Sequence, residues 1–329
     1  MSTNARYKGL FALLAALVLA LAVAACGDDD DDEGDGGEET PEASATAIEE
    51  NPDNNGIALT IGSKNFTEQI VLGEIYAQGL EAAGYDVSTD LNLGSEQVAL
   101  RALESDEISG YPEYTSTALT AFFDFAPEDV PGNAQEAFAE SEEDFAEKGL
   151  VADPPTPFSS ANAVGLLTET ADELGVSTVS DLEGKSQDLD LYGSPECRQR
   201  IDCLVGLEEN YGLEFKSFTP VDIGARYEVL DKGDADLSIL FTTDAQLFAT
   251  DDYTILEDDQ GVLPAGNVIF IANEGAAEEA GPDFGATIEQ VQENLSLEVM
   301  QELNARVDVD REKPADAARS YLEEFGYIE

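Results

Sequence analysis

The pattern that decides the fold lies in residues 56–94, "GIALTIGSKNFTEQIVLGEIYAQGLEAAGYDVSTDLNLG". A short β-rich run ends at Gly62, and apolar residues then recur at helical spacing until Gly84. A second β-rich run follows, and residues 95–108, "SEQVALRALESDEI", repeat the helical pattern. This alternation of strand and helix predicts an α/β fold, with helices covering a parallel sheet.

The rest of the chain continues the alternation and closes with two or three amphipathic helices over residues 286–328. No internal repeat is visible. The 329-residue chain is long enough, from Gly56 onward, for two domains with substantial cores.

The N-terminus predicts export from the cytoplasm. Arg6 and Lys8 precede an apolar run at 10–25 that ends in small residues directly before Cys26. This order is typical of a secretory signal, so we assign residues 1–25 to a signal peptide. "VAAC" also resembles a bacterial lipobox, which implies a lipid on Cys26. The alternative is an uncleaved anchor helix, although sixteen apolar residues are short for a membrane span. Both readings tether the protein to the outer face of the cell membrane.

Residues 26–55 are rich in acids, Gly, Ser and Pro and predict an extended, self-repelling tether. The acidic run Asp28–Asp32 could be read as a calcium site. A solvated charge run is favoured, because the spaced ligands and the turn glycine of a calcium loop are missing. We expect no metal and no cofactor.

The charge of the chain excludes some classes of partner. With 71 acidic residues, 15 basic residues and no histidine, the net charge is −56. Such a surface repels nucleic acid and anionic membranes. It suits a protein that stays soluble at high ionic strength, so we expect a salty habitat.

Three motifs stand where strands of an open α/β sheet are expected to end, and ligands bind at such ends. They are "SKNFTEQ" at 63–69, "YPEYTST" at 111–117, after the strand that follows the second helix, and "FTTD" at 241–244. Lys64 and the backbone amides of Asn65 and Phe66 would lie at a helix start, which suits an anion.

These motifs, with "LGSEQVALRALESDEISGYPEYTST", "VGLEENYGLEF" and "DADLSILFTTDAQL", resemble the substrate-binding proteins of osmoprotectant ABC importers. That family takes up glycine betaine, choline, carnitine and related compounds. The resemblance runs from about Gly56 to Gly326. It implies the two-lobed periplasmic-binding-protein fold of type II, each lobe a sheet flanked by helices. Lobe 1 would comprise residues 56–157 and 264–329, and lobe 2 residues 158–263.

The resemblance also implies a binding site. Lys64, Thr117 and Arg200 match positions that hold the ligand's carboxylate, and Tyr114 matches one wall of an aromatic cage around its ammonium. The alternative for Lys64 and Arg200 is a solvated cation, and Tyr111 is expected to pack in the core. The remaining candidates are Asn162 and Phe241, followed by Asn65, Gln97, Thr242, Asp244 and Gly266.

The chain departs from the family pattern at four positions. Ser116 replaces a glycine of "YPEYTGT", and Asn162, Phe241 and Gly266 stand where cage tyrosines are expected. The predicted cage therefore keeps two aromatic walls, Tyr114 and Phe241. At about 0.5–2 kcal/mol for each cation–π contact, this weakens trimethylammonium binding by about one to three decades.

Cys197 and Cys203 are expected to form a disulfide, since the protein is exported. The bridge would restrict a small loop that contains Arg200, which we take as a hypothesis for preorganising that side chain. Free thiols are the alternative.

The sequence therefore predicts a binding protein, not an enzyme. It would be a monomer that captures a small zwitterionic or quaternary-ammonium ligand and passes it to the transmembrane permease of an ABC importer, driven by a cytoplasmic ATPase. A binding protein for an amino acid is the nearest alternative, with Asp244 as its marker. A sensory or permease-fused receptor is disfavoured, because no later apolar run reaches membrane length. A hydrolase is also disfavoured, because the chain has no histidine, no "GxSxG" and no Walker A motif.

Overall fold

The structure is a computed structural model that describes residues 46–329. The expected signal peptide, Cys26 and residues 26–45 of the expected tether lie outside the described residues. Within the described part of the chain, no helix is both long enough and apolar enough to cross a membrane.

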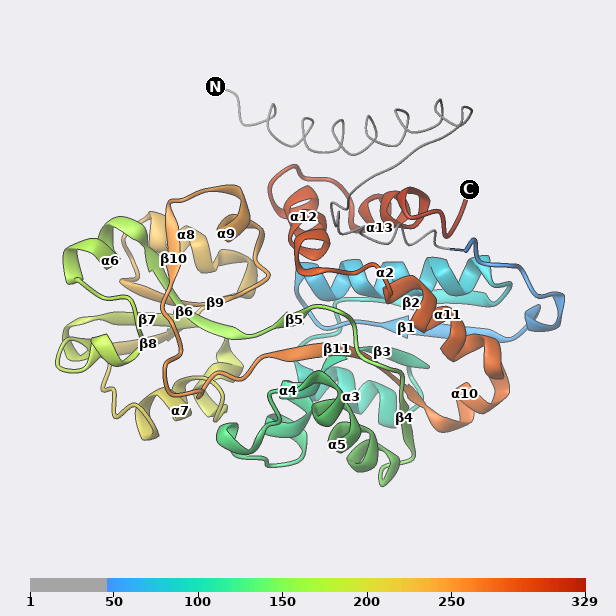
Figure 1. Cartoon of the computed structure of the whole chain (residues 1–329), viewed down its shortest axis with the longest axis horizontal. Helices are drawn as coiled ribbons and strands as arrows, with labels where there is room; N and C mark the ends of the chain where they lie inside the picture. The colour runs from blue at the N-terminus through green and yellow to red at the C-terminus, as the bar shows by residue number, and fades with distance from the viewer. Residues whose placement is uncertain (1–45) are drawn as a thin grey trace, which may run out of the picture. The chain divides into compact units, whose positions relative to one another are not determined.

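Two mixed β-sheets form the centre of the described body (Figure 1). The first sheet has the order β2-β1-β3-β11-β4, and β5 also pairs with β11. Its strands are β1 (Ala58–Gly62), β2 (Asp86–Asp90), β3 (Gly110–Tyr114), β4 (Leu150–Ala152), β5 (Ser159–Ser160) and β11 (Gly266–Asn273). We call this sheet and its helices lobe 1.

The second sheet has the order β10-β6-β9-β7-β8 and, with its helices, is called lobe 2. Its strands are β6 (Asn162–Leu167), β7 (Asp190–Gly193), β8 (Ser217–Pro220), β9 (Leu237–Phe241) and β10 (Tyr253–Ile255). Its helices are α6 (Thr168–Leu174), α7 (Leu204–Glu209), α8 (Arg226–Asp231) and α9 (Ala245–Ala249).

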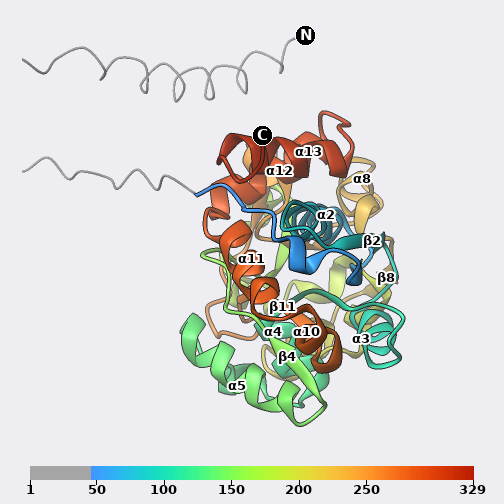
Figure 2. The same ribbon diagram turned by 90° about the vertical axis from the view of Figure 1, so that its right-hand side faces the viewer.

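Helices cover both faces of the lobe 1 sheet, as Figures 1 and 2 show. One face carries α2 (Thr67–Ala82), α11 (Pro282–Gln292), α12 (Leu297–Asp308) and α13 (Pro314–Glu324). The other carries α3 (Glu96–Glu104), α4 (Thr115–Thr117) and α5 (Ala134–Ala146), and α10 (Glu274–Ala280) follows β11. Each face buries its own apolar cluster, because successive side chains of a strand point to opposite faces.

Within the lobe 1 sheet, the predicted parallel arrangement is correct for the first three strands only, and in lobe 2 β7 is also parallel to β8 and β9. β1 is parallel to β2 and β3, whereas β11 runs antiparallel to both β3 and β4. The opening strands are joined through α2 and α3, which return the chain to the same end of the sheet. β11 instead arrives from lobe 2, so no such helix fixes its direction.

The chain passes between the lobes twice, at neighbouring places. It leaves lobe 1 through β5, which is followed after Ala161 by β6, and it returns along β11. β5 and the start of β11 pair antiparallel, with Ser160 opposite Gly266. The two crossings therefore lie side by side, which is the connection expected of a two-lobed binding protein.

The expected end of the tether at residue 55 is wrong. The Ile48 amide donates to the Tyr327 carbonyl at 2.9 Å, and the Asn51 side chain donates to Asp283 at 2.6 Å. Gly84 has a φ of +101°, and a Cβ there would lie 2.8 Å from the Asn51 carbonyl oxygen. Residues 48–55 thus belong to the folded body, because their amides and Ile48 find partners that composition alone does not reveal.

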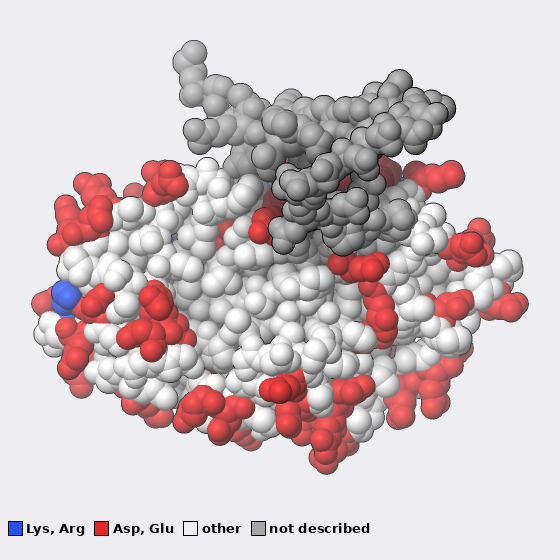
Figure 3. Space-filling view, in the orientation of Figure 1, with Lys and Arg blue, Asp and Glu red and all other residues white. Residues whose placement is uncertain are grey.

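Acidic side chains are spread over the visible face of the body, with one small basic patch at its left edge (Figure 3). Of the nine ion pairs formed among the described residues, several lie between the lobes or beneath the cavity described below, away from this surface.

Candidate functional site

A cavity of about 80 Å³ lies between the two lobes. Since a single water needs about 10–15 Å³ of such space, the cavity has room for a small molecule. Seven of the residues selected from the sequence line it, namely Lys64, Asn65, Tyr114, Thr117, Asn162, Arg200 and Phe241.

"YPEYTST" was expected to follow a strand. Instead it forms β3 itself and then α4. Alternation along β3 separates the two tyrosines. Tyr111 is fully buried in the core on the α3–α5 side, as expected for a packing residue. Tyr114, at the carboxyl end of β3, faces the cavity. The motif brings Tyr114 to the cavity because it ends a strand at the junction between the lobes.

Lys64 is bound by the protein itself. Its ammonium forms an ion pair with Glu113 on β3, and their side chains are 6% and 0% exposed. The same ammonium lies 4.6 Å from the centre of the Tyr114 ring. A cation that is both buried and paired has less attraction left for a ligand carboxylate than the sequence suggests.

The expected anion site at the start of α2 is partly engaged in hydrogen bonds within the protein. The Lys64 amide donates to the Gln69 side chain at 3.2 Å, and the Asn65 amide donates to the Gly94 carbonyl at 3.1 Å. The helix begins at Thr67, with Phe66 as its N-cap residue. Of the two amides expected to face an anion, that of Asn65 is therefore used within lobe 1.

Arg200 joins the lobes. Its guanidinium makes two hydrogen bonds to Asp202, lies 3.9 Å from Glu96 of lobe 1 and donates to Thr117 at 3.4 Å. Burial lowers the pKa of Arg200, but Asp202, followed by Glu96 and Glu113, outweighs burial and leaves the pKa raised. Arg200 is thus a permanent cation held by the protein's own carboxylates.

Three aromatic rings meet at the cavity. Phe66 stacks on Tyr114 with ring centres 6.3 Å apart and contacts Phe241 at 5.2 Å. The guanidinium of Arg226 covers the Phe241 ring at 4.0 Å and forms an ion pair with Asp244. The aromatic surface is therefore larger than predicted, but part of it carries the protein's own cations.

Phe66 and Arg226 were missed by the sequence analysis. Phe66 lies inside "SKNFTEQ" and could have been selected as an aromatic residue beside a candidate ligand. Arg226 could have been selected as one of only 15 basic residues in the chain. Three acidic residues that line the cavity were missed as well, Glu96, Glu196 and Asp202.

The Tyr114 hydroxyl is fixed by buried groups. It donates to Glu68 at 2.6 Å, and the Asn304 side chain donates to the same carboxyl at 2.9 Å. Burial raises the pKa of Glu68, and burial together with Glu68 raises the pKa of Tyr114. The hydroxyl stays protonated, and the ring is held in one orientation toward the cavity.

Asn162 and the cysteines shape the lobe 2 wall. Cys197 and Cys203 form a disulfide, with Cα atoms 5.2 Å apart. The loop between them carries Arg200 and Asp202. Asn162 donates to the Asp202 carbonyl at 2.9 Å, so this amide, expected to face a ligand, also supports the loop.

Four further candidates do not line the cavity. The Gln97 side chain donates to the Ala121 carbonyl, and the Thr242 hydroxyl accepts from the Ala161 amide. Asp244 binds Arg226, Tyr227 and the Phe241 amide. These groups position their neighbours, and Asp244 holds the arginine that covers Phe241.

Gly266, the fourth, is a close contact between β11 and α4. A Cβ at this position would lie 2.4 Å from the Ser116 hydroxyl and 2.5 Å from the Ser116 amide nitrogen. A tyrosine at 266 is therefore incompatible with this backbone. The close packing of β11 against α4 thus excludes an aromatic side chain at this position of the cage.

Comparison with known proteins assigns the chain to a family. Residues 57–324 match the family described as the substrate binding domain of ABC-type glycine betaine transport systems. The glycine-betaine-binding protein of Pseudomonas aeruginosa is 32% identical over 284 residues, which cover 82% of this chain and 89% of the relative. The chain belongs to this family.

A longer relative and a solved structure are also similar to this chain. The ergothioneine transport permease/ergothioneine binding protein of Helicobacter pylori is 27% identical, and the match spans 85% of this chain but about half, 49%, of that relative. A crystal structure of a glycine betaine/carnitine/choline ABC transporter matches with a TM-score of 0.65 at 24% identity, covering 82% of this chain and all of that one. It supports the same fold.

Membership confirms the resemblance found in the sequence, the fold class and the expectation of a binding protein without enzymatic activity. Members of the glycine betaine transport family bind substrate outside the cytoplasm for ABC import, and quaternary-ammonium osmoprotectants are their substrates. Among the described residues, no cluster of three or more His, Cys, Asp or Glu side chains could hold a metal ion.

Proposed function

We propose that the protein captures a quaternary-ammonium osmoprotectant of the glycine betaine type in the cavity between its lobes. The observation that carries this proposal is the group of rings at the cavity, Phe66, Tyr114 and Phe241. A quaternary ammonium cannot donate a hydrogen bond, so aromatic faces are the groups that hold it best.

The opposite pole of the ligand would face Thr117, Arg200 and Lys64, as the family resemblance implies. Arg200 and Lys64 already have carboxylate partners, so they would share their charge with the ligand. Asn162 would supply the polar edge in place of an aromatic wall. Four serines also line the cavity, Ser95, Ser116, Ser160 and Ser194.

Capture would be coupled to closure of the lobes. Phe66, Tyr114 and Thr117 belong to lobe 1, whereas Arg200 and Phe241 belong to lobe 2. A ligand that contacts both groups favours the closed state by its differential affinity. The closed protein would then deliver the ligand to the transmembrane permease, with energy from a cytoplasmic ATPase.

The N-terminal segment would keep the protein near its permease. A lipid on Cys26 and the acidic tether raise the effective concentration of the protein at the membrane without adding a contact. We propose that it acts as a monomer.

The alternative of an amino-acid ligand receives less support. Its marker, Asp244, would have to meet the ligand's amino group, but this carboxylate is bound to Arg226 and Tyr227 and does not line the cavity.

The test replaces a ring by a residue of similar size without a π face. Phe241→Leu should weaken binding of quaternary amines by about 2- to 30-fold, the value of one cation–π contact. Calorimetric titration at high salt measures this, after a screen of betaines, choline, carnitine, ectoine and amino acids.

Phe218→Leu is the matched control. Phe218 also lies in lobe 2 with an arginine, Arg198, 5.2 Å from its ring centre, but it does not line the cavity. This variant should bind like the wild type. Absence of saturable binding by every quaternary amine, or equal loss in both variants, would contradict the proposal.

A further inference from the structure

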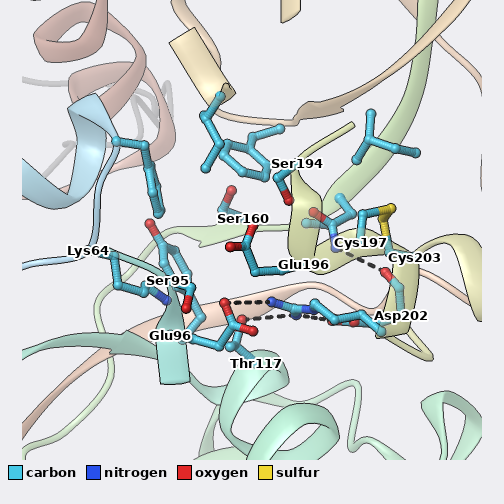
Figure 4. Close-up of a pocket in the computed structure, with 18 of the residues that line it drawn as sticks. Lys64, Ser95, Glu96, Thr117, Ser160, Ser194, Glu196, Cys197, Asp202 and Cys203 are labelled. Atoms are coloured by element: carbon cyan, nitrogen blue, oxygen red, sulfur yellow. Dashed lines mark hydrogen bonds and ion pairs between the residues drawn. A yellow bond between two sulfur atoms is a disulfide. The ribbon is translucent and has the colours of Figure 1, made fainter. Parts of the chain in front are cut away.

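Glu196 is a cavity residue whose carboxylate pairs with no cation among the described residues. It lies in the short 3₁₀ helix Pro195–Gln199 of lobe 2, next to the disulfide-bonded Cys197. In Figure 4 its side chain points into the space between Ser160 and Glu96. Its carboxylate makes no hydrogen bond or ion pair with any residue of the described range 46–329.

The cations that line the cavity, unlike Glu196, are all paired with opposite charges. Lys64 pairs with Glu113, Arg200 with Asp202 and Glu96, and Arg226 with Asp244. Each lining cation therefore has at least one carboxylate partner of its own. Counting these partners and Glu196, five carboxylates stand against three cations in and behind the cavity wall.

A wider groove adjoins the cavity and also carries negative charge, and Glu96, Glu196 and Arg200 line both. Asp124 adds a further acid to this groove, in which Arg200 is the one cation among the lining residues. Such a groove attracts cations and repels anions, and the acidic surface of the molecule strengthens the effect.

From this balance we propose that Glu196 binds the positive pole of the ligand and makes the site favour a net cation over a zwitterion. The inference rests on the proposed function and specifies its ligand: a quaternary amine without a free carboxylate. The aromatic rings hold the methyl groups, and Glu196 neutralises the charge that the rings only partly compensate. A ligand carboxylate, in contrast, would meet cations that are already paired and a surplus of negative charge.

The test uses two compounds that share a trimethylammonium group. Choline ends in a hydroxyl and is a cation, whereas glycine betaine ends in a carboxylate and is a zwitterion. Wild-type protein should bind choline more tightly than glycine betaine in calorimetric titrations at one fixed salt concentration.

Glu196→Gln keeps the shape of the side chain and removes its charge. It should weaken choline binding by about tenfold, the order expected when one partner of a partly exposed charge pair is lost. Glycine betaine should lose less, because the weaker attraction on its ammonium is offset by weaker repulsion of its carboxylate. Thermal unfolding of the variant should match the wild type, since Glu196 has no partner to lose within residues 46–329.

Glu209→Gln is the matched control. Glu209 is exposed at the end of α7, also in lobe 2, and does not line the cavity. It removes the same charge and should change neither affinity by more than about twofold. Tighter binding of glycine betaine than of choline by the wild type, or equal losses for both in Glu196→Gln, would overturn the inference and leave the proposed function standing. No saturable binding of either compound would overturn both.

Discussion

Lys64 and Arg200 line the cavity in a paired state that the sequence does not show. Both were expected at the site because they match family positions that hold the ligand's carboxylate. The partners that neutralise them, Glu113 and Asp202, stand out in no sequence pattern, because acids are present everywhere in this chain. The 15 basic residues of the chain can be considered one by one, whereas nothing in the sequence distinguishes these two acids from the other acidic residues.

Asp153, at the end of β4, allows a prediction at the scale of one residue. One of its carboxyl oxygens is buried without a hydrogen-bond partner, and burial, with Glu289, raises its pKa from 3.8 to about 7. Between these values the folded protein keeps a proton that the unfolded chain has released. The stability from the neutral form is thus complete below the unfolded pKa and is lost as the pH rises through about 7.

Asp153→Asn stays neutral at every pH. Relative to the wild type, the variant should gain about 1–3 kcal/mol in the free energy of unfolding when the pH is raised from 5 to 8. Urea unfolding at both pH values measures this gain, with Asp86→Asn, an exposed site in the same lobe, as the control. A difference between variant and wild type that is the same at pH 5 and pH 8 would refute the assignment.

At the scale of elements, the strand–helix alternation at residues 56–108 predicted β1, α2, β2 and α3 because each apolar pattern covers a whole element. The direction of β11 was not predictable, because it depends on a return from lobe 2 and on no local pattern. "YPEYTST" was misplaced by one element for a related reason: Tyr-Pro-Glu-Tyr reads as a loop but is buried as a strand.

The helix α12 carries contacts that hold the lobes together. Its Asn304 donates to Glu68 of lobe 1 and, at 3.0 Å, to the Thr243 carbonyl of lobe 2, and Gln301 donates to the Thr242 carbonyl at 3.2 Å. These contacts link α12 to the end of β9, where Phe241 meets the cavity. We therefore expect α12 to stabilise the closed state.

Asn304→Ala should weaken binding of a quaternary amine by about 2- to 10-fold, because the closed state loses hydrogen bonds worth about 0.5–1.5 kcal/mol. Asn210→Ala, at an exposed position after α7, is the control and should bind normally. Calorimetric titration compares the two. Unchanged affinity in Asn304→Ala, together with a lower melting temperature, would show that the contact persists when the lobes open.

At the scale of the whole molecule, the family resemblance predicted two lobes, and the structure contains two sheets joined by two adjacent crossings. The net charge of −56 gave no information on the fold, because it lies mainly on the surface. It did not reveal the cavity either. There, the three basic residues that line the cavity, Lys64, Arg200 and Arg226, each pair with a carboxylate.

The central claim is that a quaternary ammonium binds between the lobes, against rings contributed by both of them. A crystal structure of the protein with choline tests it most directly. We predict the trimethylammonium group within about 6 Å of the centres of the Phe66, Tyr114 and Phe241 rings, enclosed by both lobes. Choline bound to one lobe alone, or on the outer surface while Arg226 still covers Phe241 and the cavity stays without ligand, would contradict the account.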